Sequence, residues 1–318
     1  MLPRAIDVLA AAHSLRDVVE RTPLVRSPAL SAIAGTDVYL KCEQLQRTGS
    51  FKLRGASNAL AHLSEDVRAR GVVASSAGNH GLGLADAARR LGVHATIFVP
   101  ANAPRVKRDG IRAAGADVDE TQPHYDAAHA AAVRFAEETG REFVSPYAGE
   151  HLLAGQGTVA VEILEELPDV RTLLVPVGGG GLIGGIAAFV RAVAPHVRIV
   201  GVQGDASDAM ARSLEAGHVV EVPTPPTLAD GLSGQIDENG LAIGRVAIDE
   251  MRIVPEAMIL AAIAFLAREH DTKVEGSGAV TVAALLAGEA SFAGPVVAVL
   301  SGGNIDETRW SELQAVRA

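Results

Sequence analysis

The chain alternates short apolar segments with longer segments in which apolar residues recur every three or four positions. The short segments are typical of strands, and the longer ones predict amphipathic helices. We expect strands at Asp37–Lys41, Gly71–Ala74, His94–Val99, Asp117–Asp119, Glu142–Val144, Thr172–Val177, Arg198–Val202 and Pro295–Leu300. We expect helices at Leu82–Leu91, Asp126–Thr139, Gly157–Leu167 and Leu182–Val193. This alternation predicts an α/β fold with mostly parallel sheets flanked by helices.

Composition and charge narrow the class of protein. The chain is 48% hydrophobic and 21% charged, which is typical of a globular protein with one or two domains. Its net charge of −10 argues against a nucleic-acid partner. Glycines and charges interrupt every apolar run before it could span a membrane, and the N-terminus lacks a signal-peptide pattern. The only cysteine, Cys42, is interpreted as a small buried residue, and we expect a reducing, cytoplasmic location.

The segment TGSFKLRGA, residues 48–56, places Lys52 where a glycine-containing turn enters a helix. A helix N-terminus disfavours a cation, so a lysine there suggests a use for the amine. Apolar Phe51 and Leu53 flank it, and partial desolvation would lower its pKa and make it nucleophilic. A solvated surface lysine is the alternative interpretation.

The segment SSAGNHG, residues 75–81, follows an expected strand and precedes an expected helix. This layout points backbone N–H groups at an anion, and Asn79 can donate or accept a hydrogen bond there. Since serine and asparagine are also common helix caps, this loop alone is weak support for a binding site.

Two further loops follow buried strands. Gly178, Gly179, Gly180 and Gly181 come after TLLVPV and open a helix, which is the layout of a phosphate cradle, although a tight turn without a ligand is the alternative. Ser301 follows PVVAVL, where open α/β sheets place ligands, although a cap or turn would explain it alone.

Together these loops predict a phosphate-bearing cofactor. A dinucleotide-dependent oxidoreductase is the competing interpretation, because residues 178–185 superficially match a G-x-G-x-x-G pattern. That pattern belongs in the first strand–helix turn of a dinucleotide domain, whereas here it lies past mid-chain. A Walker-type NTPase is excluded because no Lys-Ser/Thr pair follows the glycines.

The motifs TGSFKLRGA, SSAGNHGLG, AGQGT, VPVGGGGLIGGIA, VEGSGA and VLSGGN occur in this order between about residue 22 and residue 304. In order and spacing they resemble fold-type II pyridoxal-phosphate enzymes, most closely the threonine/serine dehydratase and serine racemase family. The resemblance implies that Lys52 forms the internal aldimine with pyridoxal phosphate and acts as catalytic base. It implies that Asn79 bonds the ring hydroxyl and that Ser301 faces the pyridine nitrogen. The phosphate would be bound by Gly178, Gly179, Gly180, Gly181 and Leu182, and the substrate carboxylate by Ser76, Ala77, Gly78, Asn79 and His80.

The resemblance also implies an activity and an architecture. We expect an ammonia-lyase that removes water from a small β-hydroxy amino acid such as L-threonine or L-serine and gives a 2-oxo acid and ammonia. A serine racemase, a 3-hydroxyaspartate ammonia-lyase or a non-catalytic binding protein are the alternatives. We expect a large cofactor domain of residues 1–65 and 145–318, a small mobile domain of residues 66–144, and a homodimer or homotetramer.

Departures from the family pattern refine these expectations. Racemases of the family carry a serine immediately before Gly-Asn-His, and Ala77 stands there in this chain, which disfavours racemisation. Gln203 and Ala209 stand at what look like divalent-cation ligand positions, so we expect no metal ligands. Glu275, in VEGSGA, is placed near the ring or in a structural role. The chain ends soon after Ser301, which suggests a degradative role without a regulatory extension.

Overall fold

Ten strands form two sheets in the computed structural model, which describes residues 2–103, 105–288 and 291–315. The six-stranded sheet has the order β1 (Leu24–Arg26), β2 (Val38–Lys41), β10 (Val296–Val299), β7 (Thr172–Pro176), β8 (Arg198–Gly204) and β9 (Glu250–Val254). Only β1 runs antiparallel to its neighbour. The four-stranded sheet is wholly parallel, in the order β5 (Asp117–Gln122), β4 (Ala95–Pro100), β3 (Val72–Ser75) and β6 (Glu142–Phe143).

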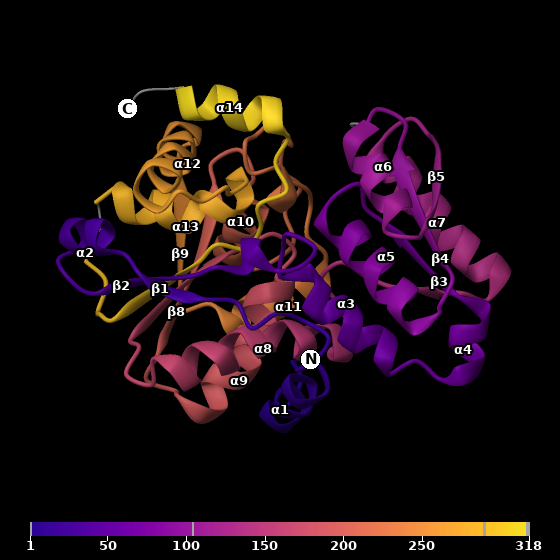
Figure 1. Ribbon diagram of the computed structural model, residues 1–318, viewed down its shortest axis with the longest axis horizontal. Helices are drawn as coiled ribbons and strands as arrows, with labels where there is room; N and C mark the ends of the chain where they lie inside the picture. Colours follow the sequence, from indigo (N-terminus) through magenta and orange to yellow (C-terminus); the bar gives the residue numbers. More distant parts are fainter. Residues whose placement is uncertain (1, 104, 289–290, 316–318) are drawn as a thin grey trace.

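Helices cover both sheets. They are α1 (Ala5–Ser14), α2 (Pro28–Ala34), α3 (Lys52–Ala61), α4 (Glu65–Arg70), α5 (Asn79–Leu91), α6 (Arg105–Ala113), α7 (Tyr125–Thr139), α8 (Glu150–Glu166), α9 (Gly181–Val193), α10 (Ala209–Ala216), α11 (Glu238–Ala247), α12 (Glu256–His270), α13 (Gly276–Leu286) and α14 (Glu307–Ala315), with short 3-10 turns η1 (Glu43–Leu45) and η2 (Asp230–Leu232). Figure 1 shows β3, β4 and β5 grouped with α4–α7 in a lobe beside the rest of the chain.

The predicted α/β architecture is confirmed, and each of the eight expected strand segments contains a strand. Two strands were not predicted, and both lie at edges of the six-stranded sheet. β1 has only three residues, and β9 reads EMRIV with charged residues at two of five positions. Neither has the continuous apolar pattern of a strand buried on both faces.

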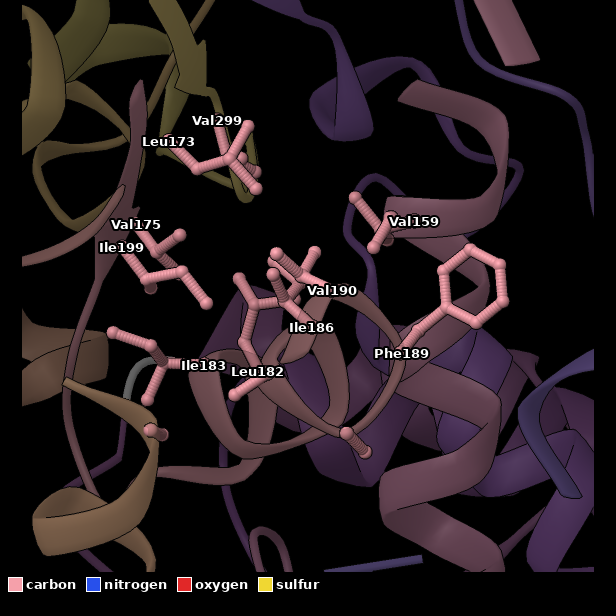
Figure 2. Packing of buried hydrophobic residues seen from close by; sticks show 14 of the residues in the cluster. Val159, Leu173, Val175, Leu182, Ile183, Ile186, Phe189, Val190, Ile199 and Val299 are labelled. Atoms are coloured by element: carbon pink, nitrogen blue, oxygen red, sulfur yellow. The ribbon is translucent and has the colours of Figure 1, made fainter. Parts of the chain in front are cut away.

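Successive side chains of the central strands point to opposite faces of the six-stranded sheet. Both faces are covered by apolar clusters, so these strands contribute to two cores. Figure 2 shows one of these cores, in which Leu173 and Val175 of β7 lie on the same side of the sheet as Ile183, Ile186 and Val190 of α9. Leu174, between the two β7 residues, belongs to the opposite core with α12 and α13. These apolar layers hold the ends of the strands, where the site is built, in fixed positions.

The helix that begins at Lys52 packs against the four-stranded sheet. Leu53 and Leu60 of α3 and Leu152 of α8 belong to the same core cluster as Ile97 of β4. All four strands of this sheet lie within residues 66–144, but its core draws on helices outside that range. Helix α3 therefore lies at the junction of the two sheets.

Several smaller expectations also have a structural outcome. Cys42 is buried, as interpreted, and its burial raises the pKa of the thiol to about 11. Within the described ranges, no helix combines the length and hydropathy needed to cross a bilayer.

Candidate active site

The Lys52 loop and the Ser301 loop are joined by backbone contacts. Ser50 forms an isolated antiparallel bridge with Gly302, and the Phe51 amide donates a hydrogen bond of 3.1 Å to the Ser301 carbonyl oxygen. Because Ser301 follows β10, a central strand, these bonds fix the start of α3 against the rigid sheet. The structure therefore brings together two loops that lie about 250 residues apart in the sequence.

Lys52 is the first residue of α3, and its side chain is only partly buried. Nζ donates a hydrogen bond of 2.7 Å to the carbonyl oxygen of Pro146, in the loop after β6. Loss of water around the amine lowers the pKa of Lys52 to about 8, although the nearby Glu275 carboxylate opposes this change. At a pH near 8 a large fraction of this amine is neutral, as nucleophilic or base chemistry requires.

This lowered pKa gives a pH prediction. The rate at which cofactor-free protein forms a lysine adduct with added pyridoxal phosphate should rise about tenfold per pH unit and level off above about pH 8, because only the neutral amine reacts. Stopped-flow absorbance would measure this rate. With N-acetyl-lysine amide in place of the protein, the rate of adduct formation should keep rising to about pH 10.4, the pKa of an ordinary lysine amine. A protein profile that follows the control would contradict the assignment of the lowered pKa to Lys52.

The glycine loop at residues 178–181 joins β7 to α9, and β7 lies beside β10, the strand that precedes Ser301. Gly180 has φ +94°, a left-handed conformation that favours glycine, and α9 begins at the following residue. Among the described residues, the backbone amides of residues 178–182 have no hydrogen-bond acceptor. Unpaired amides at a helix N-terminus form a binding site for a phosphate or carboxylate.

Tyr147 connects Lys52 to this glycine loop. It follows Pro146, the acceptor of the lysine hydrogen bond, and its ring lies against Gly179. Burial, together with the charge of Asp237, raises the pKa of Tyr147 to about 12, so its phenol stays neutral. Tyr147 was not among the residues predicted from the sequence. Its position just after the strand Glu142–Phe143 was the available signal, because ligands bind at the carboxyl ends of parallel strands.

The close approach of Tyr147 makes the glycine loop intolerant of side chains. A Cβ at Gly181 would lie 2.8 Å from Tyr147 Cα, a contact with backbone that cannot rotate away. We expect Gly181→Ala to weaken pyridoxal phosphate binding at least tenfold, because the loop must shift away from the position in which its amides converge. Equilibrium dialysis would measure this loss. Gly110→Ala is the control, since a Cβ there meets nothing within 4 Å, and equal affinity in the two variants would contradict the cradle.

Asn79 is the first residue of α5 and contacts two neighbouring loops. Its Nδ2 donates a hydrogen bond of 2.7 Å to Oε1 of Glu275, and its Oδ1 accepts one of 2.7 Å from Asn304. Burial and the charge of Asp230 raise the pKa of Glu275 to about 7. Glu275 therefore lies beside Asn79 and Lys52. It is the N-cap residue of α13, but its side chain forms no capping hydrogen bond with that helix.

The loop of residues 76–80 lies at the N-terminus of α5. The Ser76 amide donates to the Phe98 carbonyl and the Gly78 amide to Ser76 Oγ, whereas those of Ala77, Asn79 and His80 have no acceptor in the described part of the chain. His80 Nε2 lies 2.9 Å from the Val144 carbonyl, so this nitrogen carries the proton. Burial, together with the charge of Lys52, lowers the pKa of His80 to about 3, so the ring is neutral. The hydrogen bond of this imidazole ties the start of α5 to the Val144 backbone, directly after β6.

Ser301 and Leu182 complete the predicted set. Ser301 is buried, and its Oγ lies 3.5 Å from the Ser277 carbonyl oxygen, a weak contact that leaves the hydroxyl able to bond elsewhere. Leu182 lies buried in the first turn of α9, where its backbone amide belongs to the glycine loop and its side chain to the core. Three of the four predicted loops are thus in direct contact, and Tyr147 links the fourth, the glycine loop, to the segment that binds the Lys52 amine.

Three further histidines lie on the surface. His124 caps α7, and His129 and His151 are exposed on α7 and α8. Within residues 2–103, 105–288 and 291–315, no group of three or more His, Cys, Asp or Glu side chains has the geometry of a metal site. Gln203 is buried, and its Oε1 accepts a hydrogen bond from the Ala211 amide.

Comparison with known proteins places this arrangement among characterised folds. Residues 15–302 match the family described as pyridoxal-phosphate dependent enzyme. The chain is 46% identical over 304 residues to the L-threonine ammonia-lyase of Thermotoga maritima, which covers 94% of this chain and 75% of that protein. It superposes on maize serine racemase with a TM-score of 0.93 at 32% identity, covering 98% and 97% of the two chains. Threonine deaminase isoform 2 of Solanum lycopersicum gives 0.91 at 35% identity, covering 98% and 94%.

Proposed function

The chain belongs to the pyridoxal-phosphate dependent enzymes, and from this membership we propose that it eliminates water from a small β-hydroxy amino acid. L-threonine and L-serine are the proposed substrates, and a 2-oxo acid and ammonia the products. The observation that carries the proposal is Lys52, a partly buried amine whose pKa is lowered to about 8, next to a glycine loop with unpaired amides. Relatives that are named as threonine ammonia-lyases support this choice of reaction.

The residues present fit the cofactor. The unpaired amides of residues 178–182 and the N-terminus of α9 would bind the phosphate dianion. The second N–H of the Asn79 amide is available to a ring oxygen, and the Ser301 hydroxyl would face the pyridine nitrogen. A neutral hydroxyl, unlike a carboxylate, does not hold that nitrogen protonated, which favours loss of a leaving group over a long-lived carbanion.

Pyridoxal phosphate, when bound, supplies a carbonyl carbon that condenses with amines and a ring that withdraws electrons from the substrate Cα. Lys52 would supply the amine, and its neutral form would be the base that takes the α-proton. The Pro146 carbonyl accepts a hydrogen bond from Nζ and so restricts the directions in which the amine can point. Desolvation leaves a large fraction of the amine neutral near pH 8, and the neutral form is the one that can act as a base.

The loop of residues 76–80 would hold the substrate carboxylate. Its unpaired amides at Ala77, Asn79 and His80 lie at the N-terminus of α5, where the helix dipole also favours an anion. His80 is neutral and bonded to Val144, so it orients this loop without competing for protons. Holding the carboxylate here would direct the Cα–H bond toward one face of the site.

Serine racemisation is the second candidate, because serine racemases are among the structures most similar to this chain. Two-base racemisation needs a second proton donor on the opposite face of Cα, and Ala77, at the position of the racemase serine, has no such group. Ser76 has a hydroxyl, but it accepts the hydrogen bond of the Gly78 amide. Elimination is therefore favoured. Family membership also replaces the dinucleotide oxidoreductase interpretation.

The experiment is a product assay on the cofactor-loaded protein. L-threonine, L-serine and 3-hydroxyaspartate would each be incubated with it, and 2-oxo acid, ammonia and D-amino acid would be quantified. We expect a 2-oxo acid and ammonia in equal amounts. D-serine as the main product, or no ammonia from any of these substrates, would refute the proposal.

The proposal includes the assembly and division of the chain. We propose a cytoplasmic homodimer or homotetramer in which residues 66–144 form the small mobile domain and residues 1–65 and 145–318 the large one. The parallel four-stranded sheet within residues 66–144 supports that division. Sedimentation velocity would measure the oligomeric state.

A further inference from the structure

A chain of three side-chain hydrogen bonds links three of the four loops around Lys52. Asn304 Nδ2 lies 2.8 Å from the Thr48 carbonyl oxygen and 2.7 Å from Asn79 Oδ1. Asn79 Nδ2 in turn lies 2.7 Å from Glu275 Oε1. The chain therefore runs from the backbone before Lys52 to the first residue of α5 and on to the start of α13.

The direction of this chain is fixed by its first member. A backbone carbonyl oxygen can only accept, so the Asn304 atom next to Thr48 must be the amide nitrogen. That nitrogen needs an acceptor on Asn79, which must turn its Oδ1 toward Asn304. With Oδ1 bonded to Asn304, the remaining polar atom of the Asn79 amide is Nδ2, which can only donate. One hydrogen of this nitrogen goes to Glu275, and the other has no acceptor among the described residues.

We propose that Asn304 is a positioning residue that fixes the orientation of the Asn79 amide, so that Asn79 presents N–H and not C=O to the cofactor ring. The inference rests on the proposed contact between Asn79 and the ring oxygen of pyridoxal phosphate. A donor at this position stabilises the deprotonated ring oxygen, whereas an acceptor would favour the protonated form. Asn304 thus sets the protonation state of the cofactor without touching it.

The backbone around Asn304 is shaped to this role. Gly49, in the Lys52 loop, has φ +74°, and a Cβ there would lie 2.2 Å from Asn304 Oδ1. The glycine therefore provides the space into which the Asn304 amide fits, next to the Thr48 carbonyl. The Gly49 carbonyl also accepts a hydrogen bond of 2.9 Å from the Gly303 amide, which holds the two loops together.

The test is Asn304→Asp, which keeps the shape of the side chain and removes its N–H donors. The carboxylate must accept from Asn79, so the Asn79 amide turns and directs Oδ1 into the site and toward Glu275. Its bond to Glu275 is then lost unless that carboxyl is protonated and donates. The charged groups that face this position are Glu275, Asp230, Lys107 and Lys52, and none of them is changed. In a pH titration of the absorbance of the cofactor-loaded protein, we expect the midpoint to rise by about one pH unit, a tenfold change. We also expect the dissociation constant for pyridoxal phosphate to rise about tenfold.

A double-mutant cycle separates this role from a merely structural one. If Asn304 acts through Asn79, Asn304→Asp shifts the titration in the natural background and has no further effect in an Asn79→Ala background. Asn58→Asp is the matched control, because Asn58 is buried and donates a hydrogen bond of 2.7 Å to the His151 carbonyl, outside this chain of bonds. It should lower the melting temperature and leave the titration unchanged.

Two results would overturn the inference. One is an unchanged titration midpoint in folded Asn304→Asp, and the other is an equal shift with and without Asn79. Where Asn304→Asp does not fold, Asn304→Ala removes the donor without adding a charge, and the midpoint should rise by a smaller amount. No shift in that variant overturns the inference too. Failure of the proposed function is distinct, because it would appear in the products that the natural protein forms and not in the titration midpoint.

Discussion

Lys52→Ala is expected to abolish the yellow lysine–pyridoxal chromophore and to lower turnover at least about 10³-fold, because it removes both the covalent attachment and the base. The glycine loop, which is proposed to bind the phosphate, is unchanged in this variant, so the cofactor should still bind non-covalently. Absorbance spectra, borohydride reduction with peptide mapping, and the 2-oxo acid assay would measure these three properties.

Lys273→Ala is the control for this change. Lys273 pairs with Glu307 at the surface, away from the amine that contacts Pro146. This control should keep its chromophore and incorporate the reduced cofactor at Lys52. A borohydride-reducible adduct that persists in Lys52→Ala would place the covalent site elsewhere and end the assignment.

Arg54→Met should lower the free energy of unfolding by about 3–5 kcal/mol, the largest stability effect that we expect. Arg54 is fully buried on α3 and bonds Glu43 of η1 and Glu162 of α8, and Lys41 of β2 bonds the same Glu162. The two cations balance two carboxylates. Removing the guanidinium leaves the buried Glu43 without its ionic partner, a cost that urea or thermal unfolding would measure.

The loss should depend on pH. Burial alone would raise the pKa of Glu43, but the charge and hydrogen bonds of Arg54 outweigh burial and lower it. A lowered pKa in the folded state adds stability above the ordinary carboxyl pKa and loses it as the pH falls through the lowered value. The difference between Arg54→Met and the natural protein should therefore shrink in acid.

Arg21→Met is the matched control for Arg54. Arg21 also pairs with two carboxylates of α8, Glu165 and Glu166, but its side chain is 52% exposed. Water replaces its bonds at little cost, so the variant should lose less than about 1 kcal/mol. If the two variants lost equal amounts of unfolding free energy, burial would not be the reason that the Arg54 ion pairs stabilise the protein.

Much of the fold could be predicted because it depends on local patterns. Wholly apolar segments such as Thr172–Pro176 are strands buried on both faces, and the glycines that follow are the start of α9. The same kind of local pattern, a polar or glycine-containing loop next to a strand or a helix, identified Lys52, Asn79, the glycine loop and Ser301 as candidate site residues. Strand topology then explains why loops that lie far apart in the sequence are adjacent, since parallel strands end at one edge of a sheet.

What could not be predicted depends on contacts between distant segments. Tyr147 lies in a loop whose single glycine, Gly149, is the N-cap of α8 and forms no glycine-rich pattern, and its contact with Gly179 is visible only in three dimensions. Asn304 has no local pattern beyond that of a turn, because its partners Thr48 and Asn79 lie more than 200 residues away. The edge strand β9 was not predicted because its partly exposed residues have no continuous apolar pattern.

Helix α3 contributes apolar side chains to one core and Arg54 to a buried cluster of ion pairs, and this constrains how the sheets can move relative to each other. Leu53 is packed with the four-stranded sheet, whereas its neighbour Arg54 is tied to Glu43 and Glu162 on the other side. Movement of the two sheets relative to each other would therefore disturb one set of contacts or the other. Any movement of the proposed small domain, residues 66–144, would therefore have to be accommodated around Lys52, the residue that begins this helix.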